Sequence, residues 1–211
     1  MHTVVPAALS IHRTNPAARC RSHYSRRSAC FVLAFALLGN AAATWAQAQH
    51  SFAEEVEARA FALINDFRNA TGLQPIEREA RLGEAARYFV DYMAAHGKLD
   101  HQADGTTPAA RVKQRGYDYC IVSENIAYVY DSRGFTPERL AHHFVEGWEK
   151  SPGHRANILD ADITQTGLAV ARSANNKYYA AQLFARPRSD PRAGGPQAGA
   201  SPPSSRRARG C

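Results

Sequence analysis

Two histidines and one glutamate are the side chains whose types and positions suggest shared chemistry. His101 opens the polar segment His101–Gly105, Glu124 lies inside an apolar stretch, and His154 follows Ser151 in a second polar segment. An imidazole can exchange a proton near neutral pH, and together with a carboxylate it can form a metal site or an acid–base pair. A carboxylate inside an apolar strand must also find hydrogen-bond partners, because burying an unpaired charge is costly.

Each of these residues also has a simpler structural explanation. A histidine in a polar loop, such as His101, is usually a solvated side chain. Glu124 can serve to tie down the N–H groups of a loop, and the Pro-Gly pair before His154 can merely end a helix. The individual residues therefore do not establish a site, and only their combination suggests one.

Four amphipathic helices are predicted around these segments. The S-x-x-E pattern that begins at Ser51 is typical of a helix start, and apolar residues follow it at helical spacing. A second helix is expected over residues 82–97, and a third begins at Pro108. A fourth begins at Pro137 and is expected to stop at Pro152, which leaves the following histidine in a loop.

Alternation of apolar and other residues at period two predicts strands in the second half of the chain. The alternation covers residues 122–130, which include Glu124. Residues 166–171 and 178–185 are predicted as two further strands, joined as a hairpin through the turn-forming residues 173–176. The first strand is thus expected only after three helices, an order that argues against a doubly wound parallel sheet. The sequence predicts an α/β chain of the α+β type whose sheet is mainly antiparallel.

The two ends of the chain are basic and differ in composition from the middle. Residues 1–48 hold five Arg and no acid, residues 186–211 hold six Arg and one acid, and the middle keeps 15 bases against 18 acids. Four Arg, an apolar run and Ala46-Gln47-Ala48 are typical of a cleaved signal peptide within residues 1–48. Residues 50–186 form the predicted domain, and the Pro/Gly/Ser/Arg-rich residues 187–211 are expected to be a disordered tail.

These features exclude some classes of function. The middle of the chain has no cluster of basic residues that would bind nucleic acid, and no segment of the mature chain has the length and hydropathy of a membrane span. We expect a secreted or periplasmic monomer. Cys120 and Cys211 would remain after signal cleavage and could pair, although a domain of this size does not require a disulfide.

In this order, the segments resemble the CAP superfamily (cysteine-rich secretory proteins, antigen 5, pathogenesis-related 1; SCP-like domains), and most closely its short bacterial branch. The resemblance rests on His101–Gly105, on Glu124-Asn125-Ile126-Ala127 and on Trp148–Leu159, which reads W-E-K-S-P-G-H-R-A-N-I-L. It covers about residues 54–186. The resemblance implies a three-layer α-β-α sandwich with a central, mainly antiparallel sheet.

The resemblance further implies a surface cleft across which His101, Glu124 and His154 converge. Asn125 and Ser151 are expected to line the same cleft. In many members of the family two histidines and two acids form this cluster, and the histidines can hold a divalent cation such as zinc. His101 and His154 are accordingly the candidate metal ligands, with Glu124 beside them.

One member of that four-residue cluster is missing from this chain. The second acid of the longer eukaryotic members lies three residues after the tryptophan, where this sequence has Ser151. Asp104 or Glu149 would have to replace it. The sequence thus has two histidines and one acid at the positions of the cluster, and Ser151 in place of the second acid.

Three functions are compatible with such a cleft. The first is an extracellular binding module for a divalent metal, a peptide, or a lipid-like or envelope ligand. The second is a hydrolase acting on peptide or cell-wall material, with Glu124 or a metal-bound water as the base. The third is a structural or interaction scaffold in which the histidines and the glutamate clamp loops together without a ligand. We rank the binding module first and the scaffold second. The hydrolase comes last, because the sequence has neither closely spaced metal ligands nor a nucleophile elbow.

Overall fold

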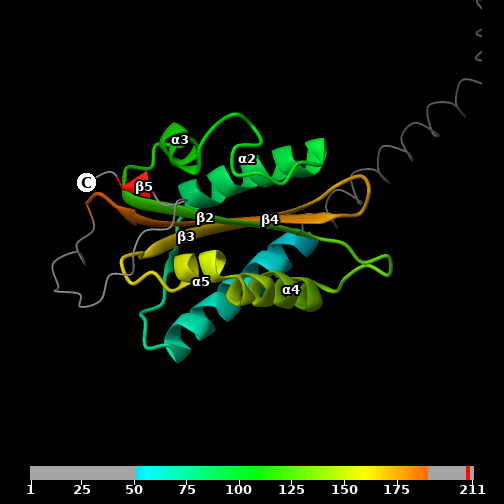
Figure 1. Ribbon diagram of the computed structural model, residues 1–211, viewed down its shortest axis with the longest axis horizontal. Coiled ribbons are helices and arrows are strands. Elements are labelled where there is room, and N and C mark those ends of the chain that lie inside the picture. The colour runs from blue at the N-terminus through cyan, green and yellow to red at the C-terminus, as the bar shows by residue number, and fades with distance from the viewer. Residues whose placement is uncertain (1–50, 190–207, 210–211) are drawn as a thin grey trace, which may run out of the picture. The chain divides into compact units, whose positions relative to one another are not determined.

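The computed structural model of the protein describes residues 51–189 and 208–209 (Figure 1), which belong to one unit, Trp45–Cys211. The signal peptide predicted over residues 1–48 lies outside the described residues, as does most of the tail predicted over residues 187–211. None of the helices in the described part of the chain combines the length and the apolar character needed to cross a membrane.

A five-stranded sheet forms the middle layer, with the spatial order β1-β3-β4-β2-β5. Its strands are β1 (Glu77–Arg78), β2 (Tyr119–Val129), β3 (Gln165–Arg172), β4 (Tyr178–Pro187) and β5 (Ala208–Arg209). The pair β1–β3 is parallel, and the other three pairs are antiparallel. The prediction of a mainly antiparallel sheet is confirmed.

Helices cover both faces of this sheet (Figure 1). On one face lie α2 (Ala80–His96) and α3 (Pro108–Gln114). On the other face lie the N-terminal helix over residues 51–70, α4 (Pro137–Lys150) and α5 (Pro152–Ile158). Each helical layer shares its own cluster of buried hydrophobic side chains with the sheet, which gives the predicted α-β-α sandwich.

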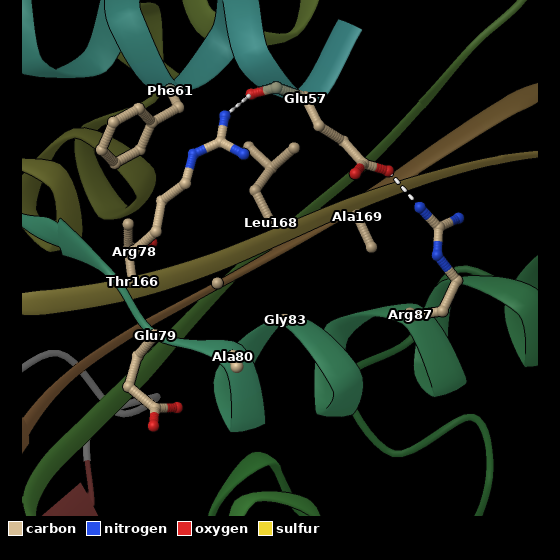
Figure 2. Close-up of a pocket in the computed structure, with 11 residues that line it drawn as sticks. Glu57, Phe61, Arg78, Glu79, Ala80, Gly83, Arg87, Thr166, Leu168 and Ala169 are labelled. Carbon is tan, nitrogen blue, oxygen red and sulfur yellow. Dashed lines mark hydrogen bonds and ion pairs between the residues drawn. The ribbon is translucent and has the colours of Figure 1, made fainter. Parts of the chain in front are cut away.

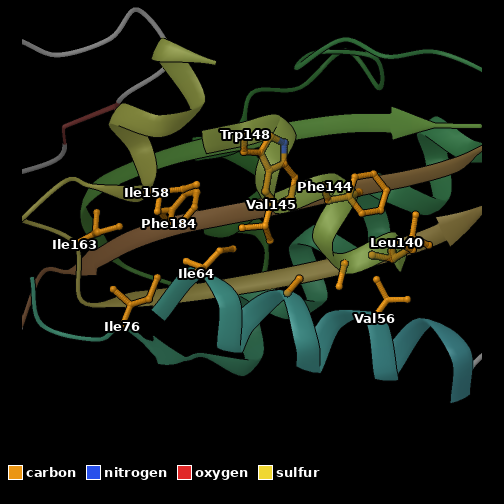
Figure 3. Close-up of a cluster of buried hydrophobic side chains, with 14 of the residues drawn as sticks. Val56, Ile64, Ile76, Leu140, Phe144, Val145, Trp148, Ile158, Ile163 and Phe184 are labelled. Carbon is orange, nitrogen blue, oxygen red and sulfur yellow. The ribbon is translucent and has the colours of Figure 1, made fainter. Parts of the chain in front are cut away.

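Side-chain caps begin two of the helices where the sequence predicted them. The hydroxyl of Thr107 accepts the N–H of Ala110, and the hydroxyl of Thr136 accepts the N–H of Arg139, each one residue before a first-turn proline. In α4 the apolar stripe then faces the sheet (Figure 3). Its members, all 0–1% exposed, are Leu140, Phe144 and Trp148.

Three local features differ from the prediction. β1 precedes α2, so the first strand does not follow three helices; with two residues it is too short to show an alternating pattern. α4 ends at Lys150, but Pro152 then begins α5 instead of a loop, which places His154 on a helix. Ala208 and Arg209 pair with β2, although they lie in the segment expected to be disordered.

Cys120 is disulfide-bonded, although the sequence indicated no need for a disulfide in a domain of this size. The residue is 6% exposed and lies near the start of β2. Directly after it, Ile121 and Val122 pair with Arg209 and Ala208 of β5. The disulfide therefore lies at the end of β2 to which β5 is attached.

Gly167 permits an unusually close approach of α2 to β3. A Cβ atom on this residue would lie 2.2 Å from the backbone nitrogen of Gly83 and 2.2 Å from the carbonyl carbon of Leu82. No side chain other than hydrogen fits that space. The contact fixes the height of the first turn of α2 above the sheet.

Candidate functional site

A buried carboxylate of β2 orients the ring of His101. His101 Nδ1 donates to Glu124 Oε1 over 2.8 Å; the Glu124 side chain is 0% exposed, whereas that of His101 is 21% exposed. A carboxylate on one ring nitrogen fixes both the orientation and the tautomer of an imidazole. The other nitrogen, Nε2, is then the atom through which His101 can accept a hydrogen bond or a proton.

Arg111, which the sequence analysis missed, connects Glu124 to a second carboxylate. Arg111 Nη2 lies 2.8 Å from Glu124 Oε2, and Arg111 Nη1 lies 3.0 Å from Asp104 Oδ1. Its guanidinium also packs over Phe89, with Cζ 3.4 Å from the ring centroid. All three charged side chains are at most 1% exposed. Of the four side chains in this network, only His101 reaches the surface.

Arg111 also holds the loop that precedes α3. It donates to the carbonyl oxygens of His101 and Thr106, each over 3.1 Å. Asp104 closes the same loop by accepting the N–H of Thr106 at 3.0 Å and its hydroxyl at 2.7 Å. Asp104 thus lies buried against Arg111 and does not supply the second acid of a metal cluster.

Amide side chains tie α5 to β2 on the opposite face of the sheet. Asn125 Nδ2 donates to the carbonyl oxygen of His154 over 3.1 Å, and Asn157 Nδ2 donates to Asn125 Oδ1 over 2.9 Å. Because neighbouring strand residues point to opposite faces, Asn125 and Glu124 reach different helical layers. The structure thus joins Glu124 with His101 and Asn125 with His154, and both pairs flank the same part of β2.

Ser151 is the junction between α4 and α5. Its backbone N–H donates to the carbonyl oxygen of Trp148 over 3.2 Å, and its own carbonyl oxygen accepts the N–H of Arg155 over 2.8 Å. Its side chain makes no capping hydrogen bond to α5. Glu149 is half-buried in the last turn of α4. Within residues 51–189, no ion pair joins Glu149 to the network around Arg111.

Few donor atoms around His101 are available to a metal ion in the described part of the chain. In residues 51–189 and 208–209, no group of three or more His, Cys, Asp or Glu side chains is arranged to hold one. Both oxygens of Glu124 are engaged, one by His101 and the other by Arg111, whereas zinc in proteins has three or four protein ligands. His101 and His154 would supply two. Zinc binding by these two histidines stays a prediction.

The sequence is similar to those of bacterial proteins over the domain just described. The profile of the cysteine-rich secretory protein family (CAP) matches residues 61–184. The Bacillus subtilis protein YkwD is 31% identical over 120 residues, which are 56% of this chain and 44% of YkwD. The B. subtilis membrane protein YlbC is 29% identical over 125 residues, which are 59% of this chain and 33% of YlbC. The chain thus spans less than half the length of either relative.

Solved structures share the fold. An outer surface protein from Borrelia burgdorferi superposes with a TM-score of 0.52 at 21% identity, over 61% of this chain and 90% of that one. An extracellular SCP-domain protein from Bacillus anthracis superposes with a TM-score of 0.51 at 23% identity, over 64% and 41% of the two chains. The family match over residues 61–184 includes all of β2 and α5, and it also includes every residue of the predicted site. This chain belongs to the cysteine-rich secretory protein (CAP) family.

Proposed function

We propose that this protein is an exported binding module whose ligand contacts His101. One observation carries the proposal: a buried network of one cation and two carboxylates ends at a single partly exposed imidazole. Asp104, Arg111 and Glu124 are at most 1% exposed, and the His101 side chain is 21% exposed. The network therefore presents one ring nitrogen to the outside.

Stability alone does not explain such a network. Removing charges from water is costly, and well-packed hydrophobic residues in place of a buried ion pair often give equal or greater stability. An imidazole that is already held in one orientation, by contrast, strengthens ligand binding. Its side chain loses little conformational entropy when the ligand binds. The network is thus better explained as support for His101 than as a device for holding the fold together.

The chemistry of His101 limits the ligand. When the ring is neutral and its Nδ1 is bound to Glu124, Nε2 is a hydrogen-bond acceptor, so the ligand of that form presents an N–H or O–H group there. We place this ligand among the peptides and lipid-like molecules of the cell envelope. Support comes from the signal-like N-terminal sequence, and from the descriptions of similar proteins as membrane, outer surface or extracellular.

The test is binding of fractionated envelope peptides and lipids to the mature protein, read by NMR chemical-shift changes. His101→Ala is expected to abolish binding. His142→Ala is the matched control, because His142 is an exposed histidine on α4 outside the network. Equal binding by both variants would contradict the proposal. Turnover of a peptide or peptidoglycan fraction that is lost in His101→Ala would replace the binding module with the hydrolase.

A scaffold without a ligand is the second candidate, and it is favoured by the pairing of both Glu124 oxygens inside the protein. The two functions differ in what happens when His101 is removed. Because the His101 ring is at the exposed end of the network, His101→Ala leaves the Arg111 ion pairs intact. The binding module predicts at most a modest decrease in melting temperature, because Glu124 loses one partner but keeps its ion pair with Arg111. The scaffold predicts a strong decrease.

A further inference from the structure

Where the short strand β1 does not cover it, β3 forms the edge of the sheet opposite to β5. Outward-pointing backbone groups of this strand already have partners at two positions. The carbonyl oxygen of Thr166 accepts the N–H of Glu79 over 2.9 Å. The N–H of Val170 donates to Glu57 Oε1 over 2.8 Å, and its carbonyl oxygen accepts from Arg87 Nη1 over 2.6 Å. Glu57 and Arg87 also pair with each other.

Leu168 lies between these two occupied positions. Because backbone groups of a strand alternate between its two sides, the N–H and C=O of Leu168 point to the same edge as those of Thr166 and Val170. Within the described residues, the structure gives neither group a hydrogen bond. Unpaired groups on an edge strand are a template for another chain. Here the template is one residue long, because outward-pointing backbone groups of Thr166 and Val170 already have partners.

A pocket of about 400 Å³ opens over Leu168 (Figure 2). The guanidinium of Arg78 lies in its wall, with Cζ 4.5 Å from the centroid of Phe61 and with Nη2 donating to the carbonyl oxygen of Glu57 over 3.1 Å. The carboxylate of Glu57 is paired with Arg87 on the far side of Leu168. Among the described residues, no carboxylate lies within ion-pair distance of Arg78. Glu57 and Glu79 also line the pocket, but their carboxylates are paired with Arg87 and Arg81. Besides these ion pairs, the pocket offers one backbone donor, one backbone acceptor and the guanidinium of Arg78.

We propose that this pocket binds the C-terminal residue of an extended peptide. The amide N–H of that residue donates to the Leu168 carbonyl oxygen, and its carboxylate accepts the Leu168 N–H and pairs with Arg78. A chain end fits better than a continuous strand, because β1 and the Glu57–Arg87 pair block the edge on both sides of Leu168. Main-chain pairing of this kind is an established mode of peptide recognition. The site uses no residue of the His101 network.

The first test blocks the pocket. A Cβ on Gly83, which lines the pocket, meets nothing within 4 Å, so Gly83→Leu adds a side chain to open space. Gly147→Leu on α4 is the matched control, because it also meets nothing within 4 Å and lies outside the pocket. The probe is N-acetyl-alanyl-alanine, titrated by NMR, and thermal melts verify that both variants are folded. Gly83→Leu is expected to weaken binding by roughly tenfold or more and Gly147→Leu by less than about twofold.

The second test concerns the carboxylate. The C-terminal amide of the same probe is expected to bind the unaltered protein roughly tenfold more weakly than the acid, because it cannot form the ion pair with Arg78. Arg78→Gln is expected to remove this difference between acid and amide. The proposal is overturned by an absence of saturable binding to the unaltered protein, by equal binding of the two leucine variants, or by equal binding of acid and amide.

Discussion

Replacing Arg111 with methionine tests whether the network beneath His101 is ionic and buried as the structure has it. The substitution keeps an unbranched side chain against Phe89 but removes the cation. It leaves two carboxylates, Asp104 at 1% and Glu124 at 0% exposed, without their partner. Removing one partner of a buried ion pair costs about 3–5 kcal/mol, so we expect a loss of about 4 kcal/mol in the free energy of unfolding.

Urea denaturation measures this loss. For a domain of this size the urea slope is about 2 kcal/mol per M, so the midpoint is expected to fall by about 2 M. Arg155→Met is the matched control, because Arg155 is exposed and its guanidinium lies over Phe67 at 4.7 Å. Loss of this exposed cation–π contact is expected to cost less than about 1 kcal/mol.

A third variant separates charge from packing. When Arg111→Met is combined with Asp104→Asn and Glu124→Gln, no uncompensated charge stays buried, so most of the lost stability is expected to return. The reasoning is refuted if Arg111→Met costs no more than Arg155→Met. It is also refuted if the triple variant is less stable than Arg111→Met alone.

Three further predictions concern the rest of the domain. Gly167→Ala is expected to lower the free energy of unfolding, measured by urea denaturation, by more than about 3 kcal/mol, because α2 must move away from β3. Gly83→Ala is expected to be neutral or slightly stabilising. Equal effects of the two variants would contradict the close approach of α2 to β3. Peptide mapping of the protein without reductant is expected to recover Cys120 linked to Cys211, because the β2–β5 register runs toward both residues. A link from Cys120 to another cysteine would contradict this. The pKa of Asp131 is lowered by a backbone N–H two residues later and by nearby guanidinium groups. Asp131→Asn is therefore expected to lower the melting temperature above about pH 4. This effect is expected to shrink as the pH falls below that and the folded-state carboxylate is protonated; an effect independent of pH would refute the assignment.

Much of the fold could be predicted because its signals are local. Thr107 and Thr136 precede prolines at helix starts, and the apolar stripe of α4 repeats at helical spacing. β1 and β5 could not be found in this way, because two residues show no period. The second role of Pro152 was missed because a proline that ends one helix can also occupy the first turn of the next.

The site was predictable only in part. Glu124 stood out because a carboxylate in an apolar strand needs partners, and the structure supplies them in His101 and Arg111. That need was also the one signal that could have led to Arg111, which precedes the buried Val112 in α3. The pairing itself could not be derived, because it joins α3 to β2 through tertiary packing. For the same reason, the involvement of Asp104 with Arg111 could not be distinguished from a role in a metal cluster.

The tautomer of His101 tests the central claim most directly. Long-range ¹H–¹⁵N NMR of the imidazole rings at a pH where His101 is neutral distinguishes a protonated Nδ1 from a protonated Nε2. We predict a proton on Nδ1, directed at Glu124, and an unprotonated Nε2 that accepts a hydrogen bond from the ligand. A proton on Nε2 with a bare Nδ1 would contradict it, since the buried carboxylate would then not hold the ring.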